Sequence, residues 1–230
     1  MFSLNPDILN DIFTYAKPLG HHEDQDKLNL GFGFLYYGLV RALRPEHILV
    51  IGSGFGFSVI CLALGLKDNG RGRLTFVDPS FDIMKHGPLK TMGGRGFWSD
   101  PNQVREHFDR FSLNGYVTHH RLTNTEFFPT YERLDLPPVD LAFLDGNHSL
   151  KHIRYDFLET LKHCRKNSYL LLHDTNIKLR ELIGHSGVKS WLKTIKREKE
   201  CFEAVDFPFS SGVAMIRVLV EGAWQHFNLQ

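Results

Sequence analysis

The sequence contains little of what marks several large classes of protein. Its three cysteines, Cys61, Cys164 and Cys201, are odd in number and far apart. They fit neither a zinc site nor a disulfide framework, which favours a reducing, cytoplasmic location. No apolar run approaches the roughly 18 residues that a membrane span needs, so no membrane association is expected. The first residues also lack the basic and apolar regions of a signal peptide.

An excess of positive charge is missing as well. The 230 residues include 27 Lys and Arg against 26 Asp and Glu, a net charge of +1, whereas a dedicated nucleic-acid binder is usually strongly basic. We therefore expect a partner that is not nucleic acid. At 42% hydrophobic and 23% charged residues, the chain has the composition of a folded globular protein. Its length suits one domain over residues 1–230, with an N-terminal helix and loop in 1–30 and the core in 31–220.

From residue 47 onward, short apolar runs alternate with helical patterns. Five apolar runs have the form of buried parallel strands, at 47–51, 73–78, 116–121, 139–145 and 168–174. Helical spacing of apolar residues is clearest over 150–164, and another helix is expected over 187–200. Two final strands, 202–207 and 213–220, are joined by a connection short enough for a hairpin. The pattern predicts an α/β fold with a doubly wound, mostly parallel sheet of seven strands that includes a C-terminal antiparallel hairpin.

The stretch 80–100 is too long for a routine connection, so a functional loop is expected there. Its Trp98 either closes over a substrate or anchors the loop in a secondary core, and the second is favoured. The histidine pairs His21-His22 and His119-His120 are expected at the surface.

The first expected strand runs into a glycine-rich turn, which consists of Gly52, Ser53, Gly54, Phe55 and Gly56. Ligands of doubly wound sheets bind at the carboxyl ends of the strands, and glycines let a ligand approach the backbone there. Asp78 and Pro79 end the next strand, where a carboxylate can accept hydrogen bonds from both hydroxyls of a ribose. The two features predict a nucleoside-containing cofactor. The alternative is a structural turn beside a solvated carboxylate.

The spacing of the glycines separates two kinds of cofactor. The dinucleotide fingerprint needs a small third residue where this chain has Phe57, which argues against an NAD-linked oxidoreductase. The spacing Gly-x-Gly-x-Gly is the one seen in class I S-adenosylmethionine-dependent methyltransferases, whose cofactor has no pyrophosphate.

Two further strand ends each carry an aspartate and a histidine. The run 139–145 leads into Asp145-Gly-Asn-His148, and the run 168–174 ends in His173-Asp174. Because neighbouring strand ends face one crevice, we expect these four side chains beside the cofactor.

With these motifs, the chain resembles the small-molecule O-methyltransferases of class I, especially those that act on sugars and natural products. The resemblance extends over residues 31–219 and is specific at 51–57, 143–156 and 170–174. It implies S-adenosylmethionine as cofactor, with Asp145 near it, a divalent metal held by Asp145 and Asp174, and His148 as general base. It also places Asn124 and Thr125 where relatives contact the adenine, although both would serve equally well at a helix N-terminus.

One residue departs from the family pattern. Some relatives have glutamate where this chain has His173, and magnesium prefers oxygen ligands, so the expected ion is magnesium, a transition metal, or none. His148 and His173, in that order, are the candidate catalytic bases, because histidine titrates near the working pH. The structural alternatives are a helix cap for His148 and a buried His173 bonded to a backbone carbonyl.

The function implied is methyl transfer to a hydroxyl of a small-molecule acceptor, and a homodimer is expected by analogy alone. The alternatives are an NAD-linked oxidoreductase and a non-catalytic nucleoside-binding domain. A further alternative is a methyltransferase that acts on the amines of nucleic-acid bases. Such enzymes resemble one another in an Asn/Asp-Pro-Pro-aromatic motif after the fourth strand. This chain has Asp145-Gly-Asn-His148 at that place.

Overall fold

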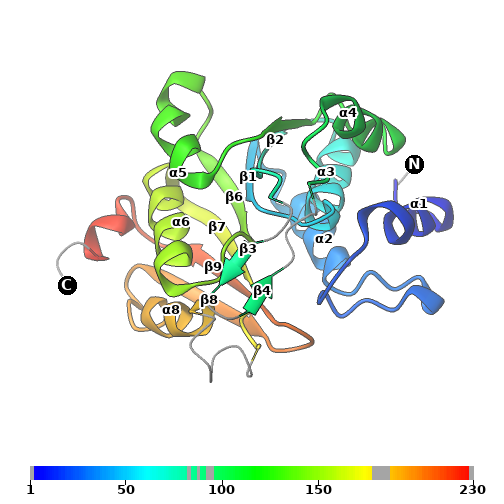
Figure 1. Cartoon of the computed structure of the whole chain (residues 1–230). Coiled ribbons are helices and arrows are strands. Elements are labelled where there is room, and N and C mark those ends of the chain that lie inside the picture. The colour runs from blue at the N-terminus through cyan, green and yellow to red at the C-terminus, as the bar shows by residue number, and fades with distance from the viewer. Residues whose placement is uncertain (1–2, 82–83, 87–88, 92–95, 178–186, 228–230) are drawn as a thin grey trace.

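The structure is a computed structural model, which describes residues 3–81, 84–86, 89–91, 96–177 and 187–227. Among these residues, seven strands form one sheet in the order β5-β2-β1-β6-β7-β9-β8 (Figure 1). The strands are β1 (His47–Ile51), β2 (Arg73–Val77), β5 (Val117–His120), β6 (Val139–Leu144), β7 (Cys164–His173), β8 (Phe202–Phe207) and β9 (Val213–Val218). The first five in this spatial order pair in parallel, whereas β9 is antiparallel to both β7 and β8. The predicted fold class and the C-terminal antiparallel hairpin are confirmed.

Successive residues of the central strands face opposite sides of the sheet. Ile48 and Val50 of β1 pack into one hydrophobic core, while Leu49 and Ile51 pack into the other. All four side chains are buried. A parallel strand that is covered on both faces needs apolar residues at every position, which is why the sequence shows unbroken apolar runs there.

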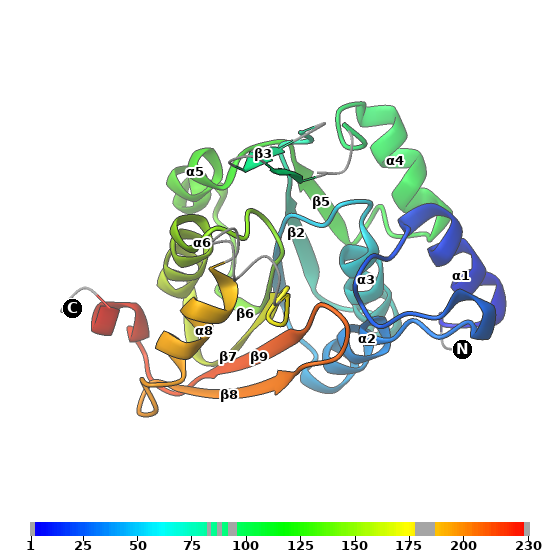
Figure 2. The same cartoon turned by 60° about the horizontal axis from the view of Figure 1, so that its bottom comes forward.

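Helices cover both faces of the sheet (Figure 2). One face carries α2 (Phe32–Leu43), α3 (Phe57–Asn69) and α4 (Pro101–Arg110), with α1 (Pro6–Asp11) and η1 (Ile12–Ala16) beside them. The other face carries α5 (Asn124–Phe127), η3 (Phe128–Leu134), α6 (Leu150–Lys162), α8 (Val188–Ile195) and η4 (Ala223–Phe227). The short helix η2 (Gln25–Lys27) belongs to the N-terminal segment that precedes α2.

Local sequence signals explain where two of these helices begin. The side chain of Asn5 accepts a hydrogen bond from the backbone N–H of Ile8, and that of Asp100 accepts one from Asn102. In both cases proline occupies the first turn of the helix, where its missing N–H costs nothing.

The stretch 80–100 contains a small hairpin of its own. The strands β3 (Met84–His86) and β4 (Leu89–Thr91) pair in antiparallel fashion, apart from the main sheet. Residues 92–95, which include Gly93 and Gly94, lie outside the described residues. Trp98 is buried in the core, so it anchors this stretch, as the favoured interpretation predicts.

Some boundaries differ from the prediction. The helix expected over 187–200 ends at Ile195, and the strand expected at 168 begins at Cys164. The short helices over residues 124–134 are expected only in the alternative that places Asn124 and Thr125 at a helix N-terminus. They begin with a capping box in which Thr123 and Glu126 bond to each other's backbone N–H, a local signal that the strand and helix pattern leaves aside.

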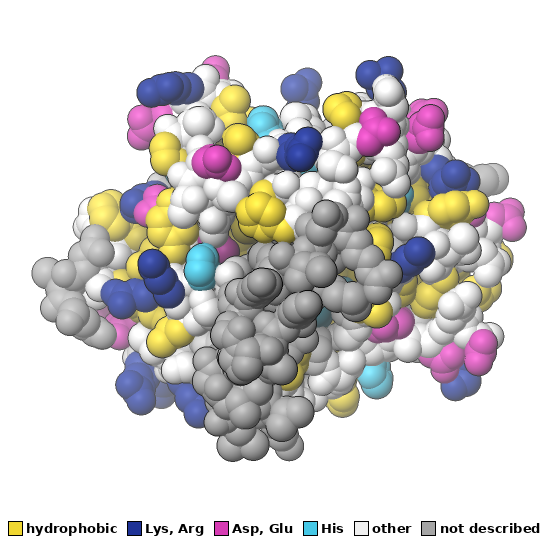
Figure 3. Space-filling model, viewed as in Figure 1, with side chains coloured by type: hydrophobic (Ala, Val, Ile, Leu, Met, Phe, Trp, Pro, Cys, Tyr) yellow, Lys and Arg dark blue, Asp and Glu magenta, His cyan; other side chains and the backbone are white. Residues whose placement is uncertain are grey.

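One face of the molecule carries charges of both signs (Figure 3). In the face shown in Figure 3, Lys and Arg side chains alternate with Asp and Glu side chains across several elements. None of the helices in the described part of the chain is both long and apolar enough to cross a membrane.

Candidate active site

The glycine turn between β1 and α3 lies against the end of β6. Gly52, Gly54 and Gly56 have φ angles of 72°, 43° and 90°, which favour glycine. A Cβ atom on Gly52 would lie 2.6 Å from the backbone oxygen of Asp145 and 2.8 Å from the Cα atom of Gly146. Only glycine fits there without a backbone shift. A Cβ atom on Gly54 would meet none of the described residues within 4 Å, so these residues leave the turn open on that side.

The two other side chains of the turn contact the protein itself. Ser53 is buried, and its Oγ lies 2.6 Å from the Oγ of Ser58 in α3. The ring of Phe55 lies edge-on to that of Phe97, with centroids 5.7 Å apart. A ligand at this turn would therefore meet mainly backbone.

Asp78 directly follows β2 and lies beside the glycine turn. Its Oδ1 accepts a hydrogen bond from the backbone N–H of Ser80 at 2.7 Å, and the carboxylate is also hydrogen-bonded to the backbone of Ser53. Burial raises the pKa of Asp78 to about 6, and these two hydrogen bonds oppose the rise. Pro79 follows and is half-buried. The structure thus brings Asp78 and the turn together.

The two Asp/His strand ends form one hydrogen-bonded network. Asp145 Oδ1 lies 2.9 Å from His173 Nδ1 and 3.2 Å from His148 Nε2. His148 Nδ1 in turn lies 2.8 Å from Asp174 Oδ2. Asp174 has a φ of 62°, an uncommon conformation for a residue other than glycine. Both structural alternatives are wrong: His148 does not cap its helix, which begins after Ser149, and His173 bonds to a carboxylate.

The contacts among Asp145, His148, His173 and Asp174 affect the pKa values of these groups more than burial does. Burial raises the pKa of Asp145, but the charges and hydrogen bonds of His173 and His148 hold it well below its usual range. Burial disfavours the charged form of His148, yet Asp174 and Asp145 raise its pKa to about 10. The pKa of His173 is raised too, because Asp145 and Asp174 outweigh its burial. At neutral pH, His148 is therefore protonated and Asp145 ionised.

His21 reaches this network from the N-terminal segment. The prediction of a surface residue is wrong here, because His21 is only 4% exposed. Its ring stacks on that of His173 with centroids 4.3 Å apart, and its Nδ1 lies 3.0 Å from the hydroxyl of Tyr36. Burial, with the charge of His173, lowers the pKa of His21 to about 3, so this ring is neutral. Ser211 Oγ lies 2.9 Å from His173 Nε2 and donates to the backbone oxygen of Gly20 at 2.6 Å.

No sequence signal marks His21 or Ser211 as part of the site. Both lie in polar connections without periodicity, and they meet His173 only after the N-terminal segment and the β8–β9 turn have folded together. Of the other paired histidines, His22 is exposed, while His119 and His120 are half-buried.

The predicted adenine contacts lie at the start of α5. The side chain of Asn124 donates to Asp156 in α6 and accepts from the backbone N–H of Thr125 at 2.8 Å. Thr125 itself is exposed, and the N-cap of the helix is Thr123. Asp156 is fully buried, and its Oδ2 would lie 3.4 Å from a Cβ atom on Gly146. Because Gly146 follows Asp145, the start of α5 lies close to the Asp/His network.

The donor atoms decide which metal fits the pair Asp145 and Asp174 that the resemblance implies. His173 Nδ1 lies 2.9 Å from Asp145 Oδ1 and 3.4 Å from Asp174 Oδ1, so a nitrogen stands between the two carboxylates. Magnesium takes oxygen ligands and retains several waters. An all-oxygen magnesium site does not fit these residues.

Comparison with known proteins identifies the family. Residues 49–175, more than half of the chain, match the family model described as a methyltransferase domain. The chain belongs to this family, and its identification as a class I S-adenosylmethionine-dependent methyltransferase is confirmed.

Two solved structures are similar in fold. The O-methyltransferase TomG of Streptomyces achromogenes, involved in tomaymycin synthesis and determined in complex with SAM, is 17% identical, with 93% of this chain and 88% of that chain covered and a TM-score of 0.65. The O-methyltransferase of Bacillus cereus, determined in complex with SAH, is 18% identical, with 92% and 89% covered and a TM-score of 0.64.

A curated relative is much longer than this chain. The uncharacterized protein y4gI of Sinorhizobium fredii (strain NBRC 101917 / NGR234) is 23% identical over 211 residues. The match includes 90% of this chain but only 21% of the relative, so the chain spans about a fifth of that protein's length.

Proposed function

We propose that this chain transfers the methyl group of S-adenosylmethionine to a hydroxyl group of a small molecule. The contact that carries the proposal joins the glycine turn to the Asp/His network: Gly52 lies directly against the backbone of Asp145 and Gly146. A nucleoside on the turn would therefore lie beside the acid and base groups. Family membership supports the methyl transfer, and the O-methyltransferases TomG and that of B. cereus support oxygen as the acceptor atom.

The cofactor would be held at three places. The backbone of Gly52 to Gly56 would lie along its methionine part, and Asp78 would accept hydrogen bonds from both ribose hydroxyls. Asn124 and Thr125 would line the adenine side, with Asn124 fixed in place by its hydrogen bond to Asp156.

The acceptor must give up a proton as it is methylated. S-adenosylmethionine supplies a methyl group on a positively charged sulfur, and His148, or in second place His173, would receive the hydroxyl proton. His148 is protonated at neutral pH without ligands, so it would first have to release that proton when the cofactor binds. Each ring has one nitrogen against Asp145, which orients it and stabilises the charge that it gains. A positive charge beside the rings disfavours their protonated forms, so both pKa values would fall when the cofactor binds.

The remaining expectations concern the class of acceptor, the cellular location and the oligomeric state. The near-neutral net charge of +1 and the absence of a strong basic excess favour a small-molecule acceptor over nucleic acid. The cytoplasmic location and the homodimer stay predictions.

Calorimetry with S-adenosylmethionine, SAH and NAD tests the cofactor. We expect both sulfur-containing ligands to bind and NAD not to bind. Release of SAH in the presence of a panel of phenols, catechols and sugars then tests the reaction. Binding of NAD without S-adenosylmethionine, or methyl transfer only to amines, would overturn the proposal.

A further inference from the structure

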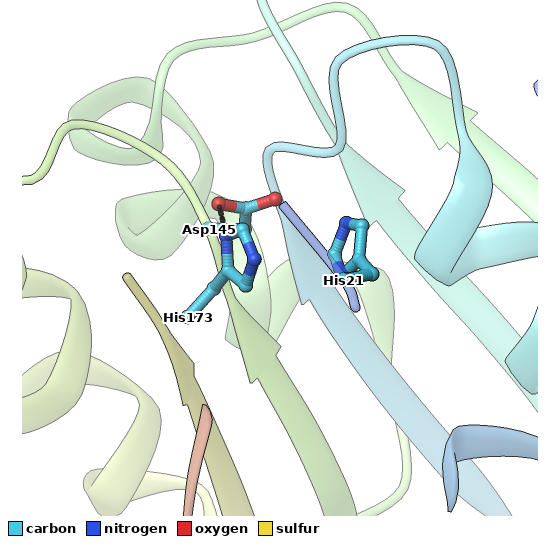
Figure 4. Close-up of side chains that lie close together, drawn as sticks. All are labelled: His21, Asp145 and His173. Atoms are coloured by element: carbon cyan, nitrogen blue, oxygen red, sulfur yellow. Dashed lines mark hydrogen bonds and ion pairs between the residues drawn. The ribbon is translucent and has the colours of Figure 1, made fainter. Parts of the chain in front are cut away.

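The ring of His173 lies between the two carboxylates that the family resemblance assigns to a metal. Its Nδ1 is 2.9 Å from Asp145 Oδ1 and 3.4 Å from Asp174 Oδ1. His173 ends β7, its side chain is buried, and Figure 4 shows its hydrogen bond to Asp145. An ion bound by both carboxylates would need the place that this nitrogen holds.

Ser211 holds the other side of the His173 ring. Its hydroxyl donates to the backbone oxygen of Gly20 at 2.6 Å, and its Oγ lies 2.9 Å from His173 Nε2. A hydroxyl has one hydrogen, so toward His173 the Ser211 oxygen is an acceptor and Nε2 carries a proton. Nδ1 faces a second acceptor, the carboxylate of Asp145, and carries a proton too. The hydrogen bonds therefore make His173 a cation that has neither nitrogen free for an ion.

The other two imidazoles at the strand ends do not supply a metal site either. The nitrogens of His148 lie 3.2 Å from Asp145 Oδ1 and 2.8 Å from Asp174 Oδ2, so both face acceptors. The ring of His21 stacks on that of His173, with centroids 4.3 Å apart and planes inclined by 21°. Nitrogens of stacked rings direct their lone pairs along nearly parallel planes and not at a common ion. The described histidines of the site thus offer no pair of nitrogens to a transition metal.

The charges within the network already balance. Two carboxylates, those of Asp145 and Asp174, face two imidazolium rings, those of His148 and His173, at 2.8 to 3.4 Å. Buried charges are stable when they are paired and hydrogen-bonded. A divalent ion would add two positive charges and would break several of these pairs to reach the carboxylates. The network therefore disfavours such an ion.

We propose that the imidazolium of His173, locked by Asp145 and Ser211, takes the place of a divalent metal, so that this chain transfers methyl groups without one. A fixed positive charge near the acceptor would stabilise its oxygen as the proton leaves, which is the contribution that a metal makes in such reactions. His173 then serves as a charge and not as the second candidate base, and Ser211 is a positioning residue that acts through it. The role in methyl transfer rests on the proposed function, whereas exclusion of the ion from the network does not.

Metal binding is a test that needs neither cofactor nor acceptor. The chelator-treated chain is titrated with Mg²⁺, Zn²⁺ and Mn²⁺ by calorimetry, and Mn²⁺ also by the electron spin resonance signal of the free ion. Asp174→Asn removes one of the two carboxylates and keeps a residue that tolerates the φ of 62° at this position. We expect the unaltered chain to bind each ion no more tightly than Asp174→Asn does.

His173→Glu should reverse this result, because it places a third carboxylate beside Asp145 and Asp174. Oxygen ligands of this kind suit Mg²⁺ and Mn²⁺. We expect His173→Glu to bind one Mn²⁺ roughly tenfold or more tightly than the unaltered chain does, and to melt at a higher temperature when Mn²⁺ is present. His173→Gln has the same length without the charge, and as the matched control it should gain no ion. Should His173→Glu not fold, the comparison with Asp174→Asn decides alone.

Ser211→Ala tests the positioning role. The variant removes the acceptor of His173 Nε2, so with an accepted substrate we expect kcat to fall several-fold while affinity for SAH stays within about twofold. Ser211→Thr keeps a hydroxyl and should restore kcat. A general disturbance of the turn before β9 would instead lower both quantities. An unchanged kcat in Ser211→Ala would contradict the positioning role.

Two results would overturn the proposal as a whole. One is an ion that the unaltered chain binds and Asp174→Asn does not. The other is methyl transfer that stops with a chelator and returns with Mg²⁺ or Zn²⁺. Both would leave methyl transfer itself in place. Conversely, a chain that excludes the ions but binds neither S-adenosylmethionine nor SAH would contradict only the proposed function.

Discussion

The indole nitrogen of Trp98 donates a hydrogen bond to the backbone oxygen of Gly54 at 2.8 Å. Trp98 also packs edge-on against Phe76 of β2, with ring centroids 4.8 Å apart, and it closes over Gly56, where a Cβ atom would lie 2.8 Å from the indole. The end of the 80–100 stretch therefore fixes the shape of the glycine turn from outside. From the sequence alone, Trp98 could either close over a substrate or anchor its loop. In the structure it supports the proposed cofactor site.

Replacing Trp98 by phenylalanine should loosen that turn. We expect Trp98→Phe to weaken binding of S-adenosylmethionine several-fold and to lower the free energy of unfolding by about 1 kcal/mol or more, because one hydrogen bond and some packing are lost. Calorimetry and urea unfolding measure the two effects. Trp191→Phe is the matched control: Trp191 in α8 is also buried, but its indole nitrogen has no hydrogen-bond partner among the described residues. That variant should lose stability with no loss of affinity.

Asp78 should matter for affinity and not for stability. Asp78→Asn removes a charged acceptor, and hydrogen bonds to charged groups contribute about 1.5–3 kcal/mol, so binding of S-adenosylmethionine should weaken roughly tenfold or more. Burial already disfavours the ionised form of this carboxyl and raises its pKa to about 6, so removal of the charge should not lower the unfolding temperature. Calorimetry beside thermal unfolding separates the two quantities. Unchanged affinity in a folded variant would show that position 78 does not hold the ribose.

His148 should affect turnover without affecting the cofactor. If it receives the hydroxyl proton, His148→Asn should reduce kcat by about 10²–10⁴, the usual contribution of general base catalysis, while affinity for SAH changes less than about twofold. Initial rates of SAH release with an accepted substrate measure this. His152→Asn changes a histidine one turn further along, which bonds to Ser149, and should keep kcat. A reduction of kcat in both variants would indicate a general disturbance of α6.

Much of the fold follows from local pattern. The apolar runs mark their strands because each strand is buried on both faces, and the short connection before β9 fixes an antiparallel pair. The Asp/His pairs at 145–148 and 173–174 meet because parallel strands present their carboxyl ends at one edge. Topology alone therefore brings the predicted side chains together.

The sequence could not predict the long-range contacts of the site. His21 stacks on a residue about 150 positions away, and Ser211 bonds to the backbone of Gly20 across 191 positions. Nothing local in either segment encodes that contact, because it depends on how the N-terminal segment packs over the sheet edge. The pairing of His148 with two carboxylates is equally hidden: the sequence predicts their proximity but not which nitrogen faces which oxygen.

The buried carboxyl of Asp156 should make stability depend on pH. Its Oδ1 accepts a hydrogen bond from Asn124, its Oδ2 has no hydrogen-bond partner in the described part of the chain, and the side chain is fully buried. Burial raises the pKa of Asp156 from 3.8 to about 7, against the lowering effect of Asn124. The folded chain therefore keeps a proton that the unfolded chain releases between about pH 4 and pH 7. Because the folded pKa is the higher one, the contribution is complete at low pH and declines through this window, by about 1.4 kcal/mol per pKa unit.

Asp156→Asn removes this titration while it keeps an acceptor for Asn124. The free energy of unfolding of the variant minus that of the unaltered chain should rise from about pH 4 to about pH 7 and level off above, whatever its absolute offset. Urea unfolding at several pH values measures this difference, in which the other titrating groups cancel. Asp68→Asn should show no slope in this window, because hydrogen bonds from Ser3 and Tyr37 overcome the burial of Asp68 and lower its pKa from 3.8, so that it is ionised in both states above about pH 5. A difference for Asp156→Asn that is flat across the window would show that this carboxyl is ionised in the folded chain.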